Sequence, residues 1–370
     1  MSELKQTRES FYFLFFCIKN LFWNSRPAAP YKMASNLVSA LLQQTMHSSK
    51  YPSPSGPTVT PFPNFDASAD ATALNNALHA KGVDEATIIN ILTTRTNWQR
   101  QQIAADYQQS VGKQLKDVLQ CKLSGKLETI ALDLLQTPAQ FDAHQLHSAI
   151  KCLGTDEDCL VEILVSRSNK EIKEIIKAFK EAFDCELEEK IKDDTSGVFQ
   201  MALIALLKAS RDESCAVDHD LADDDARALY EAGEKRKGTD VETFINILTS
   251  RNATHMQTVF ERYTKYSKHE IDKALDLELK GDIENVLISL VKCMGNKPDY
   301  FAEKLYNSMK GYGTKDKVLI RIMISRSEVD LKDIKMAYKA KYGTTLYKAI
   351  EDDTKGDYEK ILLALAGSNE

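Results

Sequence analysis

A chain of 370 residues is too long for one ordinary hydrophobic core and suits several modules. Its 43% hydrophobic and 28% charged residues exclude both a disordered chain and a bundle of membrane-spanning helices. The net charge of −6 excludes attachment to anionic lipid or nucleic acid by bulk attraction, so such binding needs a local basic patch or a bridging cation. None of the seven cysteines forms a Cys-x-x-Cys pair, which argues against a structural zinc site and favours reduced thiols.

Residues 1–32 form an N-terminal extension whose status the sequence leaves open. The apolar run from Phe11 to Trp23 is shorter than the ~20 residues needed to span a bilayer, and no good signal-peptide cleavage site follows it. Lys5 and Arg8 still provide a basic flank, so secretion or anchoring stays an alternative. A second alternative is that translation begins at Met33.

Residues 33–66 are expected to form an amphipathic tail helix followed by a linker rich in proline and serine. Leu37, Val38, Leu41 and Leu42 lie on one face of a helix over 33–46. The segment 48–63 has the Pro, Ser and Thr content of a flexible linker. The sequence therefore predicts a flexible N-terminal tail that carries a short helix.

After the tail, one pattern occurs four times, and each copy starts from a glycine. An arginine follows that glycine by 13 residues, an aromatic residue by 25 and a second glycine by 43. Because the three offsets recur in every copy, chance does not explain them, and the chain is a repeat protein. The first glycines, which we call the anchor glycines, are Gly82, Gly154, Gly238 and Gly313; the arginines are Arg95, Arg167, Arg251 and Arg326; the second glycines are Gly125, Gly197, Gly281 and Gly356.

These landmarks divide the chain into four repeats and one linker. We place repeat 1 at 67–137, repeat 2 at 138–210, an acidic linker at 211–225, repeat 3 at 226–297 and repeat 4 at 298–370. The linker lacks the glycine and glutamate that an EF-hand loop requires.

Each repeat is expected to contain about five short helices. Apolar residues follow helical spacing, as Ile88, Ile91 and Leu92 do, and breakers such as Asn97 and Gly112 interrupt the pattern. No segment alternates like a strand, so the predicted fold class is all-α.

Repeats 2, 3 and 4 combine a glycine loop with a distant acid. Forty residues after the anchor glycine stand Asp194, Glu278 and Asp353. A loop with glycine can turn several backbone carbonyls toward one point. Carbonyls with one carboxylate suit calcium, which takes six to eight oxygen ligands, and leave positions free for a phosphate oxygen. The alternative is that these acids only cap helices.

Repeat 1 departs from this rule, because Lys122 stands where the acid is expected. A full site is not predicted there. Glu85 beside Gly82 and Val83 would make a lesser site, and Leu123 with Glu128 a second one.

At these loops the chain resembles the annexin family, over about residues 66–370. The signature Lys-Gly-x-Gly-Thr, followed by Asp or Glu after 38 intervening residues, is matched in full by Lys310 to Thr314 and Asp353. The resemblance implies a curved disc of four five-helix repeats with calcium loops on its convex face. Carried over by position, it implies calcium ligands at Ile150, Cys152, Gly154 and Asp194; at Gly233, Arg236, Gly238 and Glu278; at Met309, Gly311, Gly313 and Asp353; and, in the lesser sites, at Gly82, Val83 and Glu85 and at Gln120, Leu123 and Glu128.

One departure from the family pattern concerns the second repeat, where Cys152 replaces a glycine. If the position needs a positive φ, a residue with a Cβ costs roughly 1 kcal/mol. The second site is therefore predicted to be weaker than the fourth.

The function that the resemblance implies is calcium-dependent binding to acidic, phosphatidylserine-like phospholipid membranes, with roles in membrane organisation, vesicle traffic or exocytosis, and phospholipase inhibition. In relatives such a tail binds a small EF-hand dimer or packs into the core, so residues 33–46 are a candidate for either role; an unattached tail is the alternative. The expected location is the cytoplasm and, with calcium, the membrane surface; nuclear and extracellular locations without a conventional signal peptide stay open. No nucleic acid partner is expected. A calcium-independent helical scaffold for protein partners is the alternative function.

An enzyme is not expected, because the sequence has no nucleophile elbow, P-loop, Rossmann glycines or zinc motif.

The four repeated arginines are predicted to satisfy helix carbonyls or pair with acids, with lipid contact as the alternative. The basic run 235–237 either touches phosphate or forms a solvated face. His144, His147, His255 and His269 lack metal-ligand spacing and are expected at the surface.

Overall fold

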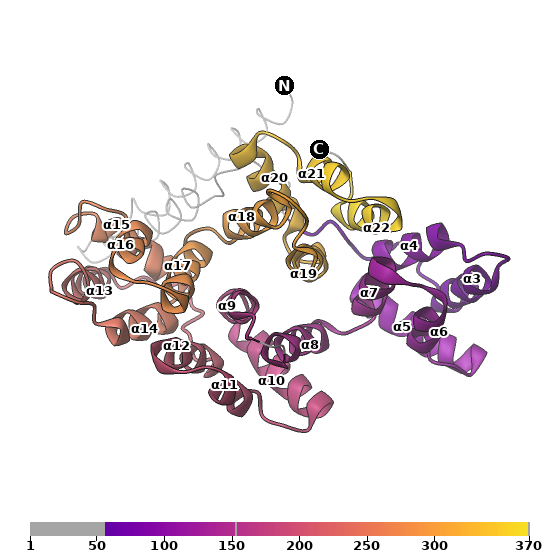
Figure 1. Ribbon diagram of the computed structural model, residues 1–370, viewed down its shortest axis with the longest axis horizontal. Coiled ribbons are helices and arrows are strands. Elements are labelled where there is room, and N and C mark those ends of the chain that lie inside the picture. The colour runs from indigo at the N-terminus through magenta and orange to yellow at the C-terminus, as the bar shows by residue number, and fades with distance from the viewer. Residues whose placement is uncertain (1–55, 152–153, 369–370) are drawn as a thin grey trace, which may run out of the picture. The chain divides into compact units, whose positions relative to one another are not determined.

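The computed structural model describes residues 56–151 and 154–368, and within them the chain forms twenty α-helices and no strand. In chain order the helices form four groups of five, and the helices of each group lie together in Figure 1. The predicted fold class and the four five-helix repeats are thereby confirmed. Residues 1–32 and the tail helix predicted over 33–46 lie outside the described residues.

The helix bounds follow the four repeats. Repeat 1 contains α3 (Ala67–His79), α4 (Glu85–Thr94), α5 (Asn97–Val111), α6 (Leu115–Lys122) and α7 (Gly125–Leu134). Repeat 2 contains α8 (Pro138–Lys151), α9 (Glu157–Ser166), α10 (Asn169–Phe183), α11 (Leu187–Asp194) and α12 (Gly197–Leu207). Repeat 3 contains α13 (His219–Ala232), α14 (Val241–Ser250), α15 (Ala253–Tyr263), α16 (Ile271–Glu278) and α17 (Asp282–Gly295). Repeat 4 contains α18 (Lys297–Met309), α19 (Asp316–Ser327), α20 (Leu331–Tyr342), α21 (Leu346–Asp353) and α22 (Gly356–Ala366).

The same local signals start the second helix of three repeats. Asp84, Asp156 and Asp240 are the N-caps of α4, α9 and α14, and each carboxylate accepts a hydrogen bond from the backbone N–H three residues later. Such a cap satisfies a helix N–H that has no partner inside the helix. The apolar stripe behind the cap is buried, as Ile88 and Leu92 show at 0% exposure.

Two predicted connecting segments differ from the expectation. Helix α13 begins at His219, inside the acidic segment expected to be a linker, because Asp218 caps it by accepting from the N–H groups of Asp220 and Leu221. The flexible linker was expected through Pro63, but from Gly56 onward the segment is held against the helices. The Thr58 hydroxyl donates to the Leu365 carbonyl at 2.7 Å.

The repeats pack in two pairs. In repeat 4, α22 packs on α4 and α7 of repeat 1; in repeat 3, α17 packs on α9 of repeat 2, and α14 packs on α12. A buried ion pair joins the two pairs: Arg321 of α19 donates from Nε and Nη2 to the two carboxylate oxygens of Glu162 in α9, each at 2.8 Å. Both side chains are almost completely buried. No described helix has the length and apolar content to cross a membrane.

Candidate metal-binding loops

The loop between the first and second helix is built around the anchor glycine in all four repeats. The anchor glycines have φ of 88°, 89°, 83° and 86° in repeats 1 to 4, in the left-handed region that favours glycine. In each loop the N–H two residues after the anchor glycine donates to a carbonyl of the preceding helix, as Asp156 does to Ala149 at 3.0 Å and Lys315 to Ser308 at 2.7 Å. The glycine loop predicted from the sequence therefore forms a turn that is closed by a backbone hydrogen bond in each repeat.

The structure brings the distant acid to this loop in repeats 2, 3 and 4. Helices α11, α16 and α21 each have eight residues and end at Asp194, Glu278 and Asp353. The threonine that follows the anchor glycine donates its hydroxyl to that acid. The distances are 2.6 Å for Thr155 to Asp194, 3.4 Å for Thr239 to Glu278 and 2.6 Å for Thr314 to Asp353. We call each such loop and acid a loop–acid pair.

The three acids keep free coordinating capacity. Asp194 and Glu278 are exposed and Asp353 is half-buried. Within the described residues, none of the three forms an ion pair with a lysine, arginine or histidine. A carboxylate oriented by one hydroxyl and not neutralised by a cationic side chain is suited to bind a metal ion.

The composition of the loop–acid pairs indicates which metal fits. The described residues contain no group of three or more His, Cys, Asp or Glu side chains placed to hold a metal. A site here takes its ligands from one carboxylate and the loop carbonyls. Oxygen ligands of this kind fit a hard cation such as calcium, whose six to eight ligands include backbone carbonyls.

The three loops differ at the position two residues before the anchor glycine. Repeat 4 has Gly311 there, with φ of +100°. In repeat 3 the loop hydrogen bond, from Asp240 to Ala232, spans one residue more than in the other repeats. Arg236 occupies the position, and the C-cap Gly233 has φ of −110°. In repeat 2 the position is Cys152, outside the described residues, so the weaker second site stays a prediction. The positive φ of Gly311 supports its premise.

Repeat 1 has the loop without the acid. Lys122 is the last residue of α6 and is exposed, and Val83 replaces the threonine. Of the residues predicted for the lesser sites, Gly82 and Gln120 are exposed, Val83, Glu85 and Glu128 are half-buried, and Leu123 is buried at the end of α6. Glu85 opens α4 and Glu128 lies in the first turn of α7.

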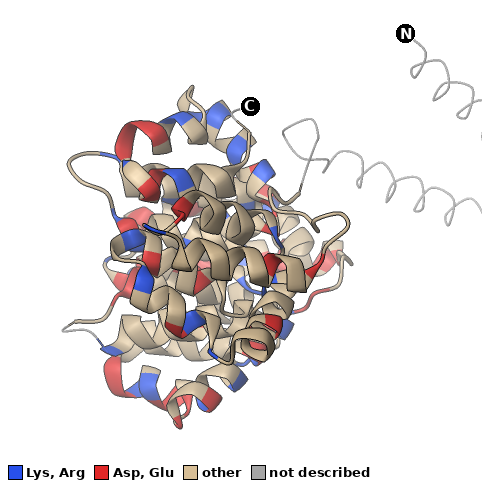
Figure 2. Cartoon of the chain, turned by 90° about the vertical axis from the view of Figure 1, so that its right-hand side faces the viewer, with Lys and Arg blue, Asp and Glu red and all other residues tan. Residues whose placement is uncertain are grey.

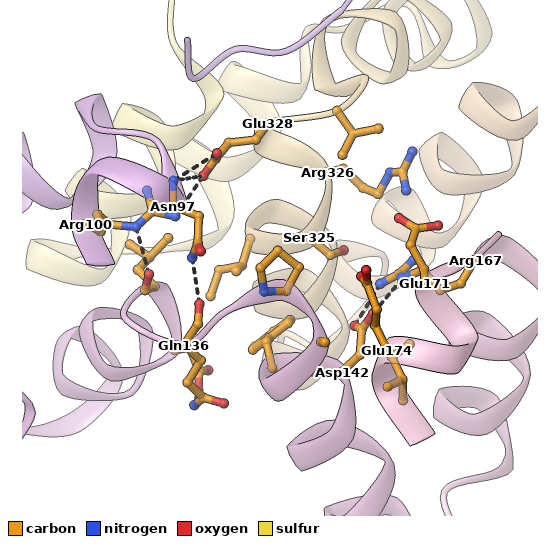
Figure 3. Close-up of a pocket in the computed structure, with 18 residues that line it drawn as sticks. Asn97, Arg100, Gln136, Asp142, Arg167, Glu171, Glu174, Ser325, Arg326 and Glu328 are labelled. Carbon is orange, nitrogen blue, oxygen red and sulfur yellow. Dashed lines mark hydrogen bonds and ion pairs between the residues drawn. The ribbon is translucent and has the colours of Figure 1, made fainter. Parts of the chain in front are cut away.

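The repeated arginines form ion pairs, as one of the two alternatives predicted. Arg95, Arg167 and Arg251 donate from Nε to Asp70, Asp142 and Asp225, each at 2.7 Å. In repeat 4, Phe301 stands at the corresponding place, and its ring lies 4.8 Å from the Arg326 guanidinium, which pairs instead with Asp330 at 2.6 Å. Figure 3 shows Arg167 directed at Asp142. These arginines therefore have a structural role.

Two further features lie outside the loops. A pocket of about 140 Å³ is lined by residues of repeats 1, 2 and 4, among them Asn97, Gln136 and Glu174, and by none of the loop residues (Figure 3). The prediction that His255 lies at the surface is wrong, because this residue is only 3% exposed. Its Nε2 lies 3.0 Å from the Asp225 carboxylate, which also accepts a hydrogen bond from Arg251.

The fold and the loops define a class of protein: an all-helical protein of four repeats whose loops offer oxygen atoms as metal ligands. The annexin family model matches residues 69–134, 141–206, 224–290 and 300–365, one match per repeat. The chain belongs to the annexin family, whose general property is calcium-dependent phospholipid binding.

The chain is similar to annexin A1 of Cavia cutleri, with 59% identity over 312 residues that cover 84% of this chain and 90% of the relative. This similarity confirms the resemblance to annexin A1 that the stretches 81–89, 224–234 and 263–269 suggest. Among solved structures, annexin III superposes with a TM-score of 0.83 at 43% identity, covering 85% of this chain and 98% of that one. A calcium-bound annexin (Sm)1 superposes with a TM-score of 0.77 at 32% identity, covering 85% and 94%.

Proposed function

We propose that this chain binds calcium at the loop–acid pairs of repeats 2, 3 and 4 and attaches through the bound ions to membranes rich in acidic, phosphatidylserine-like phospholipid. The observation that carries the proposal is the hydroxyl–carboxylate contact in these three repeats, which holds an unpaired acid beside a loop of backbone carbonyls. Calcium-dependent phospholipid binding is the general property of the family, and the proposal assigns it to particular residues of this chain.

The proposed ligands are those that the family pattern assigns. They are the carbonyls of Ile150, Cys152 and Gly154 with Asp194; of Gly233, Arg236 and Gly238 with Glu278; and of Met309, Gly311 and Gly313 with Asp353. Three carbonyls and a bidentate carboxylate leave one to three of calcium's six to eight positions for water or a lipid phosphate. The two lesser sites of repeat 1, with Glu85 and Glu128, are proposed to bind more weakly, since neither has a loop–acid pair.

The charge of the protein explains why a bridging ion is needed. The net charge is −6, and Figure 2 shows acidic and basic residues interspersed over the helices in that view. A surface of this kind has no bulk attraction for an anionic membrane. Bound calcium reverses the charge locally, at the exposed loops. Tyr312 at the tip of the fourth loop is fully exposed and is placed to enter the interfacial layer, where aromatic side chains are favourable.

The wider roles follow from covering a membrane surface. We propose membrane organisation, vesicle traffic or exocytosis, and inhibition of phospholipases by denying them access to lipid. The tail segment 33–46 is proposed to bind a small EF-hand dimer through its apolar face. A pull-down with the isolated 33–46 peptide tests that partner, and recovery of no such dimer contradicts it. The expected locations are the cytoplasm and calcium-loaded membrane surfaces.

Sedimentation with phosphatidylserine vesicles tests the proposal. The chain is expected to pellet with calcium and to stay in the supernatant with a chelator, whereas phosphatidylcholine vesicles leave it in the supernatant in both conditions. The triple variant Asp194→Ala, Glu278→Ala, Asp353→Ala is expected to lose most calcium-dependent pelleting. Protein that remains in the supernatant at saturating calcium contradicts the proposal and favours the calcium-independent scaffold.

A further inference from the structure

Repeat 1 keeps part of the backbone of a loop–acid pair but carries the opposite charge at the acid's position. Helix α6 has eight residues, as α21 does, and Lys122 ends it as Asp353 ends α21. The next residue is extended in both, with ψ of 168° at Leu123 and at Thr354. The anchor glycines also agree, with φ of 88° and 86°. The loops differ two residues before the anchor glycine, where Ala80 has φ of −60° and Gly311 has φ of +100°.

Two side chains have changed together in repeat 1. Where repeats 2, 3 and 4 have a threonine that donates to the acid, repeat 1 has Val83, which has no donor. Where they have the acid, it has Lys122. Both halves of the hydroxyl–carboxylate contact are missing, so this position has lost the carboxylate ligand and the group that orients it.

The charge that Lys122 provides equals the charge that calcium creates elsewhere. A calcium ion with two positive charges beside one carboxylate leaves a net single positive charge, and a lysine ammonium carries that same charge with no metal. Lys122 and the neighbouring Lys81 are exposed, and neither has an ion pair or hydrogen bond among the described residues. Of the other charged residues here, Lys126 pairs with Asp316 at 2.7 Å and Asp84 caps α4, whereas Glu85 and Glu128, in the first turns of α4 and α7, form no ion pair among the described residues.

We infer that Lys122 binds a phosphate of an acidic lipid directly, so that repeat 1 has permanently the positive charge that repeats 2 to 4 acquire only with calcium. The inference rests on the proposed function, because it assumes that the loops face the membrane. The lesser calcium sites use other acids, Glu85 and Glu128, and the second of them takes the carbonyls of Gln120 and Leu123, on either side of Lys122.

A matched pair of lysine variants tests the inference. Lys116→Ala removes the same charge from the same helix, at an exposed position about 9 Å farther from the loop along the helix axis. Partition onto phosphatidylserine vesicles is measured at saturating calcium, at low and at high salt. Because one lysine near an anionic surface contributes about 1 kcal/mol, Lys122→Ala is expected to weaken partition about fivefold at low salt. The difference disappears at high salt, where the interaction is screened.

The control and the stability of the variants decide the outcome. With about 0.1 M as the low-salt condition, Lys116→Ala is expected to weaken partition by less than about twofold, because Lys116 lies farther from the loop than Lys122 by about one Debye length. Equal partition of the two variants overturns the inference. So does a Lys122→Ala variant that unfolds at a lower temperature but partitions as the unchanged chain does, since Lys122 would then only complement the helix dipole.

The reverse experiment restores the calcium pattern. Ala80→Gly with Val83→Thr and Lys122→Asp is expected to steepen the dependence of partition on free calcium by about one ion. An unchanged slope in this triple variant contradicts the equivalence of the two positions. Soluble glycerophosphoserine at millimolar concentration is expected not to displace the chain from the vesicles. If it does displace the chain, and only when Lys122 is present, the ligand is a free phosphate ester and the proposed lipid contact is overturned. If the unchanged chain never pellets with calcium, the proposed function itself fails, which separates the two failures.

Discussion

Repeat 2 contains two polar pairs, one buried and one exposed. The buried pair is complete: Arg167 donates to both carboxylate oxygens of Asp142, at 2.7 and 2.9 Å, and neither residue is more than 7% exposed. In the exposed pair, Asp194 accepts a hydrogen bond from the hydroxyl of Thr155 and has no ion pair among the described residues. Two aspartates of one repeat thus have different roles. The exposed aspartate can bind a ligand, whereas the charge of the buried one is already neutralised by Arg167 and serves the fold.

The largest expected effect is on the buried pair. Asp142→Ala leaves the Arg167 guanidinium buried without its partner, and we expect a loss of about 3–5 kcal/mol in the free energy of unfolding. Urea denaturation of the variant and of the unchanged chain measures this difference in the free energy of unfolding. The exposed control Asp193→Ala, whose contact with Lys190 is 3.6 Å long, is expected to change the free energy by less than about 1 kcal/mol. Similar losses in both variants would break the distinction between the two kinds of pair.

A half-buried acid without a basic partner extends the comparison. Burial raises the pKa of Asp133 from 3.8 to about 7, and this residue lines the pocket of Figure 3. Between these two pH values the folded chain binds more protons than the unfolded one, so this group makes stability fall as pH rises through the window. Asp133→Asn is expected to remove that fall and to raise stability at pH 8, by up to about 4 kcal/mol. Urea unfolding at pH 5 and pH 8 checks it; parallel pH profiles for both proteins contradict the shift.

The exposed pair is expected to respond in calcium binding and not in folding. Asp353→Ala should lower calcium affinity at the fourth site about 100-fold, and Thr314→Val about tenfold, because the hydroxyl only orients the ligand. Calorimetric calcium titration in the presence of acidic vesicles measures both. Asp352→Ala is the control from the same helix and should leave the titration unchanged. A smaller effect of Asp353→Ala than of its neighbour would end the assignment of this acid.

The smallest expected effect separates the second loop from the fourth. Cys152→Gly should raise the calcium affinity of the second site about fivefold, since a strain of roughly 1 kcal/mol is relieved. The reciprocal Gly311→Cys, at a position with φ of +100°, should weaken the fourth site by a similar factor. Calorimetry on both variants gives the two factors. No gain in the first variant refutes the strain.

Helix content and repeat architecture were predictable because they depend on local spacing. The glycine loops and the acids at 40 residues were also found from the sequence, since glycines and acids keep fixed offsets. The role of the threonines was missed, although a signal was present: the residue after the anchor glycine is threonine in the three repeats with the acid and Val83 in the repeat with Lys122.

Other contacts were not accessible to sequence spacing. The partners of the arginines stand 25 or 26 residues before them, an offset that no helical period connects, and in repeat 4 the partner changes to Asp330 because Phe301 replaces the aspartate. His255 was misplaced at the surface because its burial depends on Asp225, a residue of another helix. Such pairings are set by packing in three dimensions.

The bond between Glu162 and Arg321 has a consequence for how the molecule comes apart. In an open array of repeats, units unravel one at a time from the ends, because each touches only its neighbours. Here an ionic bond that water hardly reaches connects positions 159 residues apart in the chain. Unfolding of the repeats on one side would leave Glu162 or Arg321 without its partner on the other side. Thermal denaturation should therefore be a single cooperative transition that involves all four repeats.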